Sequence, residues 1–162
     1  MYINLEAIFL RYGDNVIFEN LNYKFNEGLY IVRGESGIGK TTLLNLVAGY
    51  IKPDSGNVFT QNAKISYLIQ ETVLFSNLTV RENIYIKFAS TNIDEKALNN
   101  FIFENLSEIG LSSDLLDKKV SLLSGGQKRK LELLLLSMDQ SDAVLLDEPF
   151  ANLDENSINQ NY

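Results

Sequence analysis

The sequence predicts an α/β fold: a mostly parallel sheet flanked by helices, with antiparallel strands at the N-terminus and an inserted helical subdomain. Three observations lead to this prediction. Two stretches rich in β-branched and aromatic residues, 2–10 and 16–25, flank a turn at 12–15, which is typical of an antiparallel hairpin. A glycine-rich turn separates an apolar run from a stretch with helical apolar spacing at 43–48. A short apolar run, Ala143–Leu146, ends in two acidic residues, as expected of a buried parallel strand.

The first half of the chain is expected to hold further strands and one helix. A strand at 29–33 leads into the glycine-rich turn. The helix after the turn is expected to end near Tyr50, because Pro53 follows as a stop signal. Two short strands are then expected, at 57–60 and 64–69.

The pattern becomes helical from Thr79. Thr79 and Glu82 have the spacing of a capping box, which starts a helix. A second helix is expected from 94 to 109, with Gly110 as its stop, and a third short one after Ser113. Residues 79–120 are therefore predicted to form an inserted helical subdomain. The core would consist of residues 1–78 and 121–162.

The glycine-rich turn lies between a predicted strand and a predicted helix, which is the context of a phosphate-binding P-loop. Glycines allow the backbone to approach a polyphosphate closely, and the loop amides and the helix start attract an anion. Lys40 adds a mobile positive charge, and the Thr41 hydroxyl can take one position on Mg²⁺. The alternative is an ordinary glycine-rich turn. The loop consists of Gly34, Glu35, Ser36, Gly37, Ile38, Gly39, Lys40, Thr41 and Thr42.

The composition indicates a globular chain of 162 residues with a net charge of −7. This charge is a poor match for the phosphates of DNA or RNA, so we expect no nucleic-acid partner, and phosphate affinity has to come from a local site. The sequence has no cysteine and no histidine, which excludes a disulfide framework and a thiolate metal site. A reducing cytoplasm fits. No apolar run has the length of a membrane span, so the chain is expected to be soluble.

Two acidic residues at the end of the 143–146 strand are the second candidate site. In an α/β sheet, carboxylates at the C-terminal end of such a strand face the same crevice as the P-loop. Asp147 can hold Mg²⁺ through water, and Glu148 can polarise the water that attacks a γ-phosphate. The alternative is that two acids simply begin a loop.

The third candidate site is the start of a helix at Ser124, a suitable N-cap residue. Gly125 and Gly126 would leave backbone amides open to an anion, although a capped helix after a flexible turn is an equal alternative. The helix that follows is apolar nearly all round and is predicted to be buried. Its basic run, 128–130, is predicted to be a solvated face.

Together these motifs resemble the nucleotide-binding domain of ATP-binding cassette (ABC) proteins, a family with a P-loop NTPase core. Residues 34–41 match the Walker A motif, and 144–148 match Walker B. The Q-loop, signature and D-loop motifs correspond to Gln70, to Leu123-Ser124-Gly125-Gly126-Gln127, and to Ala151-Asn152-Leu153-Asp154. The order and spacing agree over nearly the whole chain.

The resemblance implies a head-to-tail dimer, with a second copy or another nucleotide-binding domain, that sandwiches ATP and Mg²⁺. Walker A of one protomer would then face the signature residues of the other, including Gln127. Tyr12 would stack on adenine, Gln70 would contact Mg²⁺ and the attacking water, and Asp154 would signal across the dimer. Residues 70–78 would contact a membrane permease, which implies a cytoplasmic, peripheral location on the inner face of the cell membrane.

The sequence departs from the family pattern at one point. That pattern continues past the D-loop into a helix, another strand and a switch histidine, whereas this sequence ends soon after Asp154 and contains no histidine. In similar ATPases the additional strand lies between the Walker A and Walker B strands, so its loss would leave backbone groups and apolar side chains unsatisfied. Either the chain is a fragment of a longer protein, or a swapped or added segment fills the gap.

Three functions are compatible with these motifs. The first is an ATP-hydrolysing subunit of an ABC transporter that powers a separate permease. The second is a truncated module that binds ATP without efficient hydrolysis, which the absent histidine favours. The third, a soluble ABC ATPase of the repair type, fits less well because 40–124 contains only a compact helical segment and no long coiled coil. The sequence does not identify the transported substrate or the direction of transport.

Overall fold

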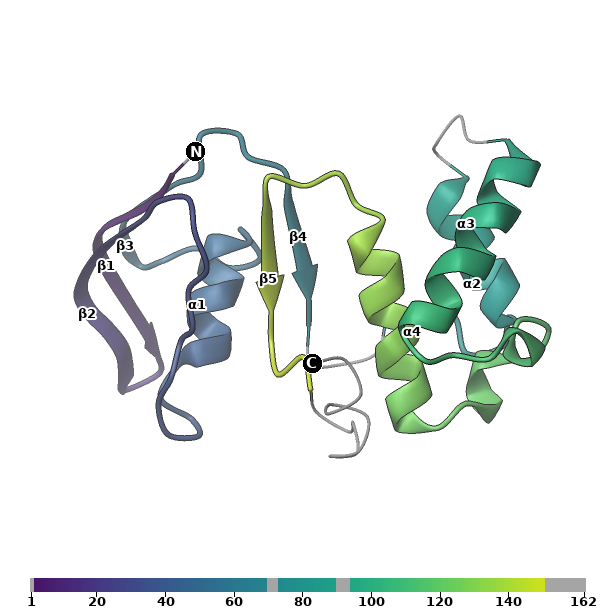
Figure 1. Cartoon of the computed structure of the whole chain (residues 1–162). Helices are drawn as coiled ribbons and strands as arrows, with labels where there is room; N and C mark the ends of the chain where they lie inside the picture. Colours follow the sequence, from purple (N-terminus) through teal and green to yellow (C-terminus); the bar gives the residue numbers. More distant parts are fainter. Residues whose placement is uncertain (1, 70–72, 90–93, 151–162) are drawn as a thin grey trace. The chain divides into compact units, whose positions relative to one another are not determined.

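The computed structural model describes residues 2–69, 73–89 and 94–150. The chain forms two compact units. The sheet unit comprises Met1–Tyr67 and Ser141–Asp147, and the helical unit comprises Leu68–Gln140 and Glu148–Tyr162. Figure 1 labels the elements of both units, each of which is described below by itself.

A three-stranded antiparallel sheet forms one layer of the sheet unit. Strands β1 (Ile3–Tyr12), β2 (Asn15–Phe25) and β3 (Ser55–Phe59) are hydrogen-bonded in the order β2-β1-β3. Tyr12 pairs with Asn15 across the hairpin turn, and Ile3 pairs with Phe25 at the other end. The predicted N-terminal hairpin is confirmed.

Helix α1 (Lys40–Val47) packs on this sheet and carries the core of the sheet unit. Its Leu46 and Val47 are buried against four side chains of β1, namely Ile3, Leu5, Ile8 and Leu10. Strands β4 (Ile65–Leu68) and β5 (Ala143–Leu146) form a second, two-stranded sheet, and their arrows run in the same direction in Figure 1. Both were expected as strands. Ile65, Ala143 and Leu145 pack against the core that α1 and β1 share.

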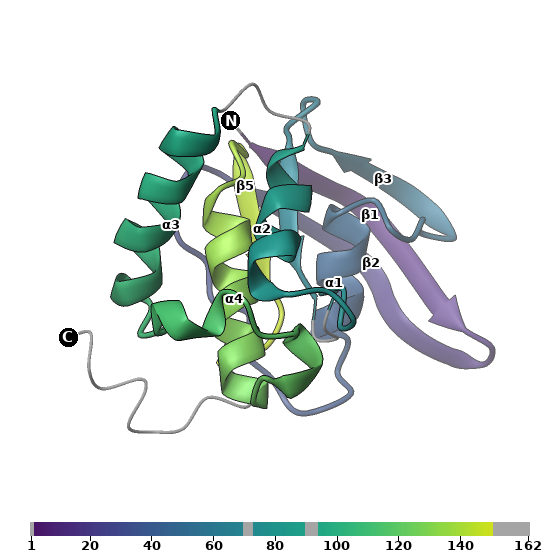
Figure 2. The same cartoon turned by 90° about the vertical axis from the view of Figure 1, so that its right-hand side faces the viewer.

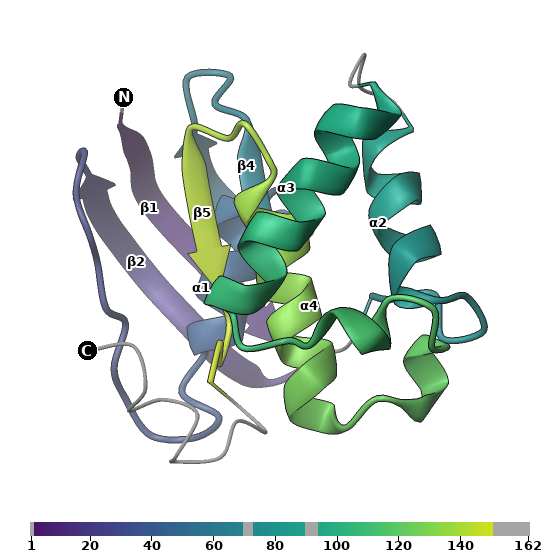
Figure 3. The ribbon, with the colours of Figure 1, turned by 45° about the vertical axis from the view of Figure 1, so that its right-hand side comes forward.

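The predicted strand at 29–33 is wrong. These residues follow β2 without sheet pairing, and Figure 3 shows the stretch as a plain coil. Leu29 is 91% exposed and Ile31 is 69% exposed. A strand needs a neighbour for its amide and carbonyl groups, and none of the described strands pairs with this segment.

Strand β5 shows a related departure from its sequence pattern. Its continuous apolar run predicts a strand covered on both faces, but Val144 and Leu146 remain 51% and 42% exposed. Only the opposite face, through Ala143 and Leu145, packs on the core. The hydrophobic pattern of β5 is therefore only half satisfied within the described residues.

The helical unit is built from α2 (Val80–Phe88), α3 (Glu95–Glu108) and α4 (Gly125–Ser137), with the short 3₁₀ helices η1 (Ser113–Leu115) and η2 (Val120–Leu122). Figure 2 shows the three α-helices gathered together. They share one core, to which α2 contributes Val80 and Ile84, α3 contributes Leu98, Ile102 and Leu106, and α4 contributes Leu131 and Leu134.

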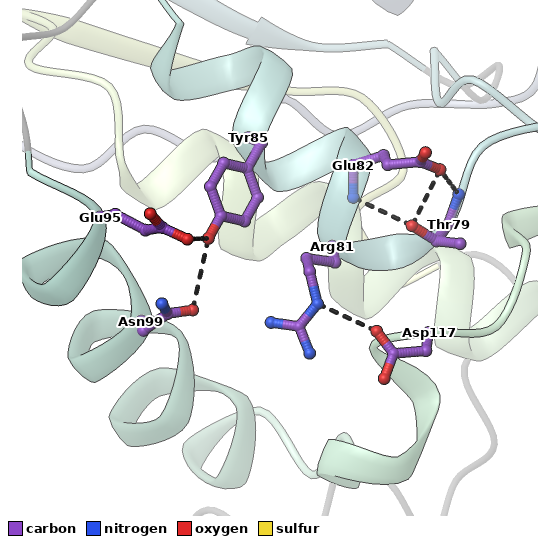
Figure 4. A network of polar contacts seen from close by, with 7 residues as sticks. All are labelled: Thr79, Arg81, Glu82, Tyr85, Glu95, Asn99 and Asp117. Atoms are coloured by element: carbon purple, nitrogen blue, oxygen red, sulfur yellow. Dashed lines mark hydrogen bonds and ion pairs between the residues drawn. The ribbon is translucent and has the colours of Figure 1, made fainter.

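Polar contacts fix the starts of the helices in this unit. Thr79 accepts a hydrogen bond from the Glu82 amide at 3.1 Å, and the Glu82 carboxylate accepts one from the Thr79 amide at 2.7 Å, which confirms the predicted capping box. Figure 4 shows this pair beside the ion pair of Arg81 and Asp117, 3.0 Å apart. Asp117 is largely exposed, so this ion pair adds only about 0.2–1 kcal/mol.

None of the described helices is both long and apolar enough to span a membrane.

Candidate nucleotide-binding site

The glycine-rich loop ends where α1 begins, in the sheet unit. Gly39 is the N-cap residue of α1, and no side chain caps the helix. The first amides of a helix have no partner within it, so they remain available to a ligand. Gly39 has a φ of +105°, and a Cβ placed there would lie 2.7 Å from Cγ2 of Ile17. Only glycine fits this position without displacing Ile17.

Lys40 closes the loop upon itself. Its ammonium group donates hydrogen bonds to the carbonyl oxygens of Gly34 at 2.9 Å and Glu35 at 2.7 Å. Residues 34–38 are exposed, so the loop surrounds an open position with a positive charge at its base. Free amides at the start of a helix and a mobile cation together form a site for an anion such as a phosphate.

Asp147 follows β5 at the C-terminal end of that strand and is 5% exposed. Burial of the Tyr67 hydroxyl, reinforced by the negative charge of the nearby Asp147 carboxylate and by Tyr50, raises the pKa of Tyr67 to about 12. A buried carboxylate close to a phenol retains acceptor oxygens for a cation. The hydroxyl of Thr41 and the carboxylate of Asp147 are both oxygen donors, as Mg²⁺ prefers. Within the described ranges no three His, Cys, Asp or Glu residues form a metal-binding cluster, so these two donors would leave most of the Mg²⁺ coordination to water and phosphate.

Glu148 begins the segment of the helical unit that follows β5. Its side chain is exposed while its backbone has a φ of +46°, a left-handed conformation that costs a non-glycine residue about 1–2 kcal/mol. The carbonyl oxygen of Glu148 accepts a hydrogen bond from Nη2 of Arg129 at 2.9 Å. The backbone is thus held while the carboxylate remains accessible to water, which suits a residue that has to polarise a water molecule.

The signature residues form the start of α4, as expected. Ser124 caps the helix by accepting from the Gln127 amide at 3.2 Å, and the Gln127 side chain accepts from the Ser124 amide at 2.9 Å. This capping box uses the amides of Ser124 and Gln127. The amides of Gly125 and Gly126 lie in the first turn, where a helix offers no acceptor of its own.

Three further sequence candidates remain to be placed. Tyr12 is the last residue of β1 and is 54% exposed, so its ring is accessible to a ligand. Gln70 and Asp154 both lie outside the described residues. Their expected contacts with Mg²⁺ and with the opposite protomer stay predictions.

The basic run at 128–130 is not uniformly solvated, and the expectation is wrong for Arg129. This side chain is 5% exposed and pairs with Glu132, whose side chain is 2% exposed, at 3.2 Å. Lys128 and Lys130 are half-buried. A signal was present in the sequence, because residues three apart share one helix face and Glu132 complements the charge of Arg129. The contact of Tyr67 with Asp147 had no such signal, since it depends on the pairing of β4 with β5.

Comparison with known proteins identifies the family. The ABC transporter family profile matches residues 18–151. The spermidine/putrescine import ATP-binding protein PotA of Fusobacterium nucleatum is 32% identical over 94% of this chain and 43% of its own length. The ergothioneine transport ATP-binding protein EgtV of Helicobacter pylori is 32% identical over 94% of this chain and 76% of its own length. The chain thus spans less than half of the first relative and about three quarters of the second.

Solved structures confirm the fold. An ABC transporter ATP-binding protein from Pyrococcus furiosus superimposes with a TM-score of 0.81, at 23% identity, over 97% of this chain and 80% of that protein. A dimeric ATP-binding cassette in a post-hydrolysis state with ADP and Pi gives the same TM-score over 96% of this chain and 77% of its own. The family profile covers most of the chain and includes the P-loop, Asp147, Glu148 and the capped start of α4. This protein belongs to the ATP-binding subunits of the ABC transporter family.

Proposed function

We propose that this chain binds ATP with Mg²⁺ and hydrolyses it as the ATPase subunit of an ABC transporter, driving a separate membrane permease. The observation that carries this proposal is the loop at the start of α1. There an uncapped helix start, glycines with positive φ and the ammonium of Lys40 surround one open position. Phosphates are the ligands that such a site favours.

The roles of the site residues follow from their placement and chemistry. Residues 34–42 would cradle the phosphates, and Thr41, Asp147 and Gln70 would supply oxygen ligands to Mg²⁺ or its waters. Glu148 would act as the general base, with Lys40 and Gln70 as further catalytic groups. Tyr12, whose ring is exposed, would stack on the adenine.

The partners are proposed from the relatives. One structural relative is a dimer bound to ADP and Pi, and another is an ABC transporter in an inward-facing conformation. We propose a head-to-tail pair of nucleotide-binding domains in which residues 124–127 and Asp154 contact the opposite copy. The segment 70–78 would face the permease at the inner side of the cell membrane. Residues 79–120 would act as the helical subdomain, and 1–78 with 121–162 as the ATP-binding core.

The named substrates of the relatives do not agree with one another, since they include spermidine, putrescine and ergothioneine. What the relatives share with this chain is the ATP-binding module. The proposal is therefore restricted to the ATP-driven step. The transported solute is assigned to the permease.

A second candidate function is a module that binds ATP without efficient hydrolysis. It is favoured by the absence of histidine from the sequence, because the family resemblance implies a histidine at the γ-phosphate. The two candidates predict the same nucleotide binding. They differ in phosphate release.

Binding and phosphate release measured side by side separate them. In the transporter-ATPase proposal, Glu148→Gln retains nucleotide affinity and lowers phosphate release by about 10²–10⁴-fold, because general-base catalysis is removed. Glu104→Gln, which changes an exposed carboxylate on α3, is the matched control and retains both properties. Saturable binding without any release by the unaltered chain supports the second candidate. Release that Glu148→Gln leaves unchanged contradicts the role of Glu148.

A further inference from the structure

The buried side chain of Arg129 joins three segments of the helical unit. It lies on α4, one turn after the capped start of that helix, and forms an ion pair with Glu132 on the same face. Both side chains are at most 5% exposed. Charged groups this deeply buried are retained only where hydrogen bonds satisfy them. The hydrogen bonds of Arg129 therefore indicate what it does.

Three backbone carbonyl groups accept hydrogen bonds from the guanidinium of Arg129. Its Nη1 donates to Ile69 at 2.9 Å, its Nη2 to Glu148 at 2.9 Å, and its Nε to Pro149 at 3.1 Å. Glu148 and Pro149 are consecutive, so one planar group binds two successive peptide units. Such a fork fixes the orientation of the backbone as well as its position.

The peptide units that Arg129 holds are those next to the exposed carboxylate of Glu148. Glu148 has a left-handed backbone with a φ of +46°, which residues with a side chain adopt only when their surroundings impose it. Two hydrogen bonds from one rigid guanidinium provide that constraint. The direction of the Cα–Cβ bond of Glu148 follows from this backbone conformation.

The ion-pair partner of Arg129 extends the same arrangement. Oε1 of Glu132 accepts a hydrogen bond from the Val73 amide at 3.2 Å, while its Oε2 pairs with Arg129. Ile69 and Val73 are thereby held by neighbouring residues of one helix face. The pair acts as a single clamp on the backbone of Ile69, Val73, Glu148 and Pro149.

We propose that Arg129 is a positioning residue that holds the strained backbone of Glu148 so that its carboxylate points at the attacking water. This inference rests on the proposed ATPase function. A lysine cannot replace Arg129 here, because a single ammonium does not present donors in a planar fork to several carbonyl groups. Arg129→Lys and Arg129→Met are thus both expected to disturb the clamp.

The test compares catalysis with nucleotide binding. For Arg129→Lys we expect kcat for ATP hydrolysis to fall about tenfold or more through misplacement of Glu148. The dissociation constant for MgATP should stay within about twofold of its original value, because the P-loop belongs to the sheet unit. Glu132→Gln, which keeps a hydrogen-bonding side chain, should give an intermediate loss. Lys128→Met on the same helix is the matched control and should retain the full rate.

Amide hydrogen exchange shows whether the clamp exists in solution. Exchange at Val73 and in a peptide covering 145–150 should accelerate in Arg129→Lys and Arg129→Met, while α3 keeps its protection. An unchanged kcat in Arg129→Lys overturns the proposal, as does an equal loss of rate and nucleotide affinity. A chain that hydrolyses no ATP contradicts the proposed function instead. In that case exchange alone decides the role of Arg129, and unaltered exchange at both places overturns it.

Discussion

The ammonium of Lys40 donates a hydrogen bond to the carbonyl oxygen of Glu35 at 2.7 Å, so the lysine folds back over the loop that precedes it. The second bond, to Gly34 at 2.9 Å, completes a closed ring of backbone and side chain. A phosphate oxygen entering the loop would offer this ammonium a charged acceptor in place of two neutral carbonyls. Charged acceptors form the stronger hydrogen bonds.

Lys40→Met is predicted to weaken ATP binding. A hydrogen bond to a charged group contributes about 1.5–3 kcal/mol, which corresponds to a tenfold to hundredfold loss of affinity. Lys52→Met removes an exposed lysine from the same unit and serves as the control. Isothermal titration with MgATP measures both. Equal affinity in the two variants would mean that Lys40 does not contact the phosphates.

Gly39→Ala is predicted to destabilise the sheet unit more than Gly49→Ala. Both glycines have positive φ, so each substitution carries a backbone cost of about 1–2 kcal/mol. Only at Gly39 would the new Cβ meet another side chain, Ile17, at 2.7 Å, whereas nothing lies within 4 Å at Gly49. Urea denaturation should therefore show the larger loss for Gly39→Ala. Equal losses would show that the loop packs differently against β2.

The stability of the protein is predicted to fall above pH 10 in a manner that depends on Tyr67. The pKa of Tyr67 rises from 10.0 to about 12 on folding, through burial and the nearby Asp147 carboxylate. Between these values the unfolded chain loses the phenolic proton first, so ionisation favours unfolding and stability declines as the pH rises. Below pH 10 the group is protonated in both states and contributes no pH dependence.

Tyr67→Phe isolates this effect from the other tyrosines and the lysines. The free energy of unfolding of Tyr67→Phe should fall less steeply between pH 10 and 12 than that of the unaltered chain. Tyr50→Phe, which removes the ring next to Tyr67 at 5.5 Å but not the phenol of Tyr67, is the comparison variant. Parallel pH profiles for Tyr67→Phe and the unaltered chain would contradict the shifted pKa.

Ile31 is predicted to contribute little to folding, in contrast to Ile8. Ile8 is fully buried in the core of the sheet unit, and its truncation to alanine should cost about 2–5 kcal/mol. Ile31 is 69% exposed, so Ile31→Ala should change the free energy of unfolding by less than about 0.5 kcal/mol. Chemical denaturation of both variants measures the difference. A large cost at Ile31 would indicate that 29–33 is buried as a strand in solution, as its sequence pattern predicts.

Elements with local signals could be predicted from the sequence. The hairpin of β1 and β2, the capping box at Thr79 and the N-cap at Ser124 are determined by residues close together in the chain, and the structure confirms all three. The strand at 29–33 failed because a strand requires a partner, which apolar periodicity does not supply. The same reason explains why β5 formed but left Val144 and Leu146 exposed.

The candidate site divides in the same way. The loop at 34–42 and the acids at 147 and 148 are contiguous motifs, so their positions at the start of α1 and the end of β5 could be predicted. Arg129 was misjudged because the basic run around it is typical of a solvated face. Its actual environment depends on carbonyl groups of Ile69 and Pro149, which are 60 and 20 residues away in the chain. Contacts over such separations are products of the fold and carry no local pattern.

The most direct test of the central claim is equilibrium titration of the folded chain with fluorescently labelled ATP in the presence of Mg²⁺, with circular dichroism as the check on folding. We predict saturable binding that unlabelled ATP displaces and that Lys40→Met weakens at least about tenfold. A folded chain that shows no saturable binding would contradict the assignment of the loop at the start of α1 as a nucleotide site.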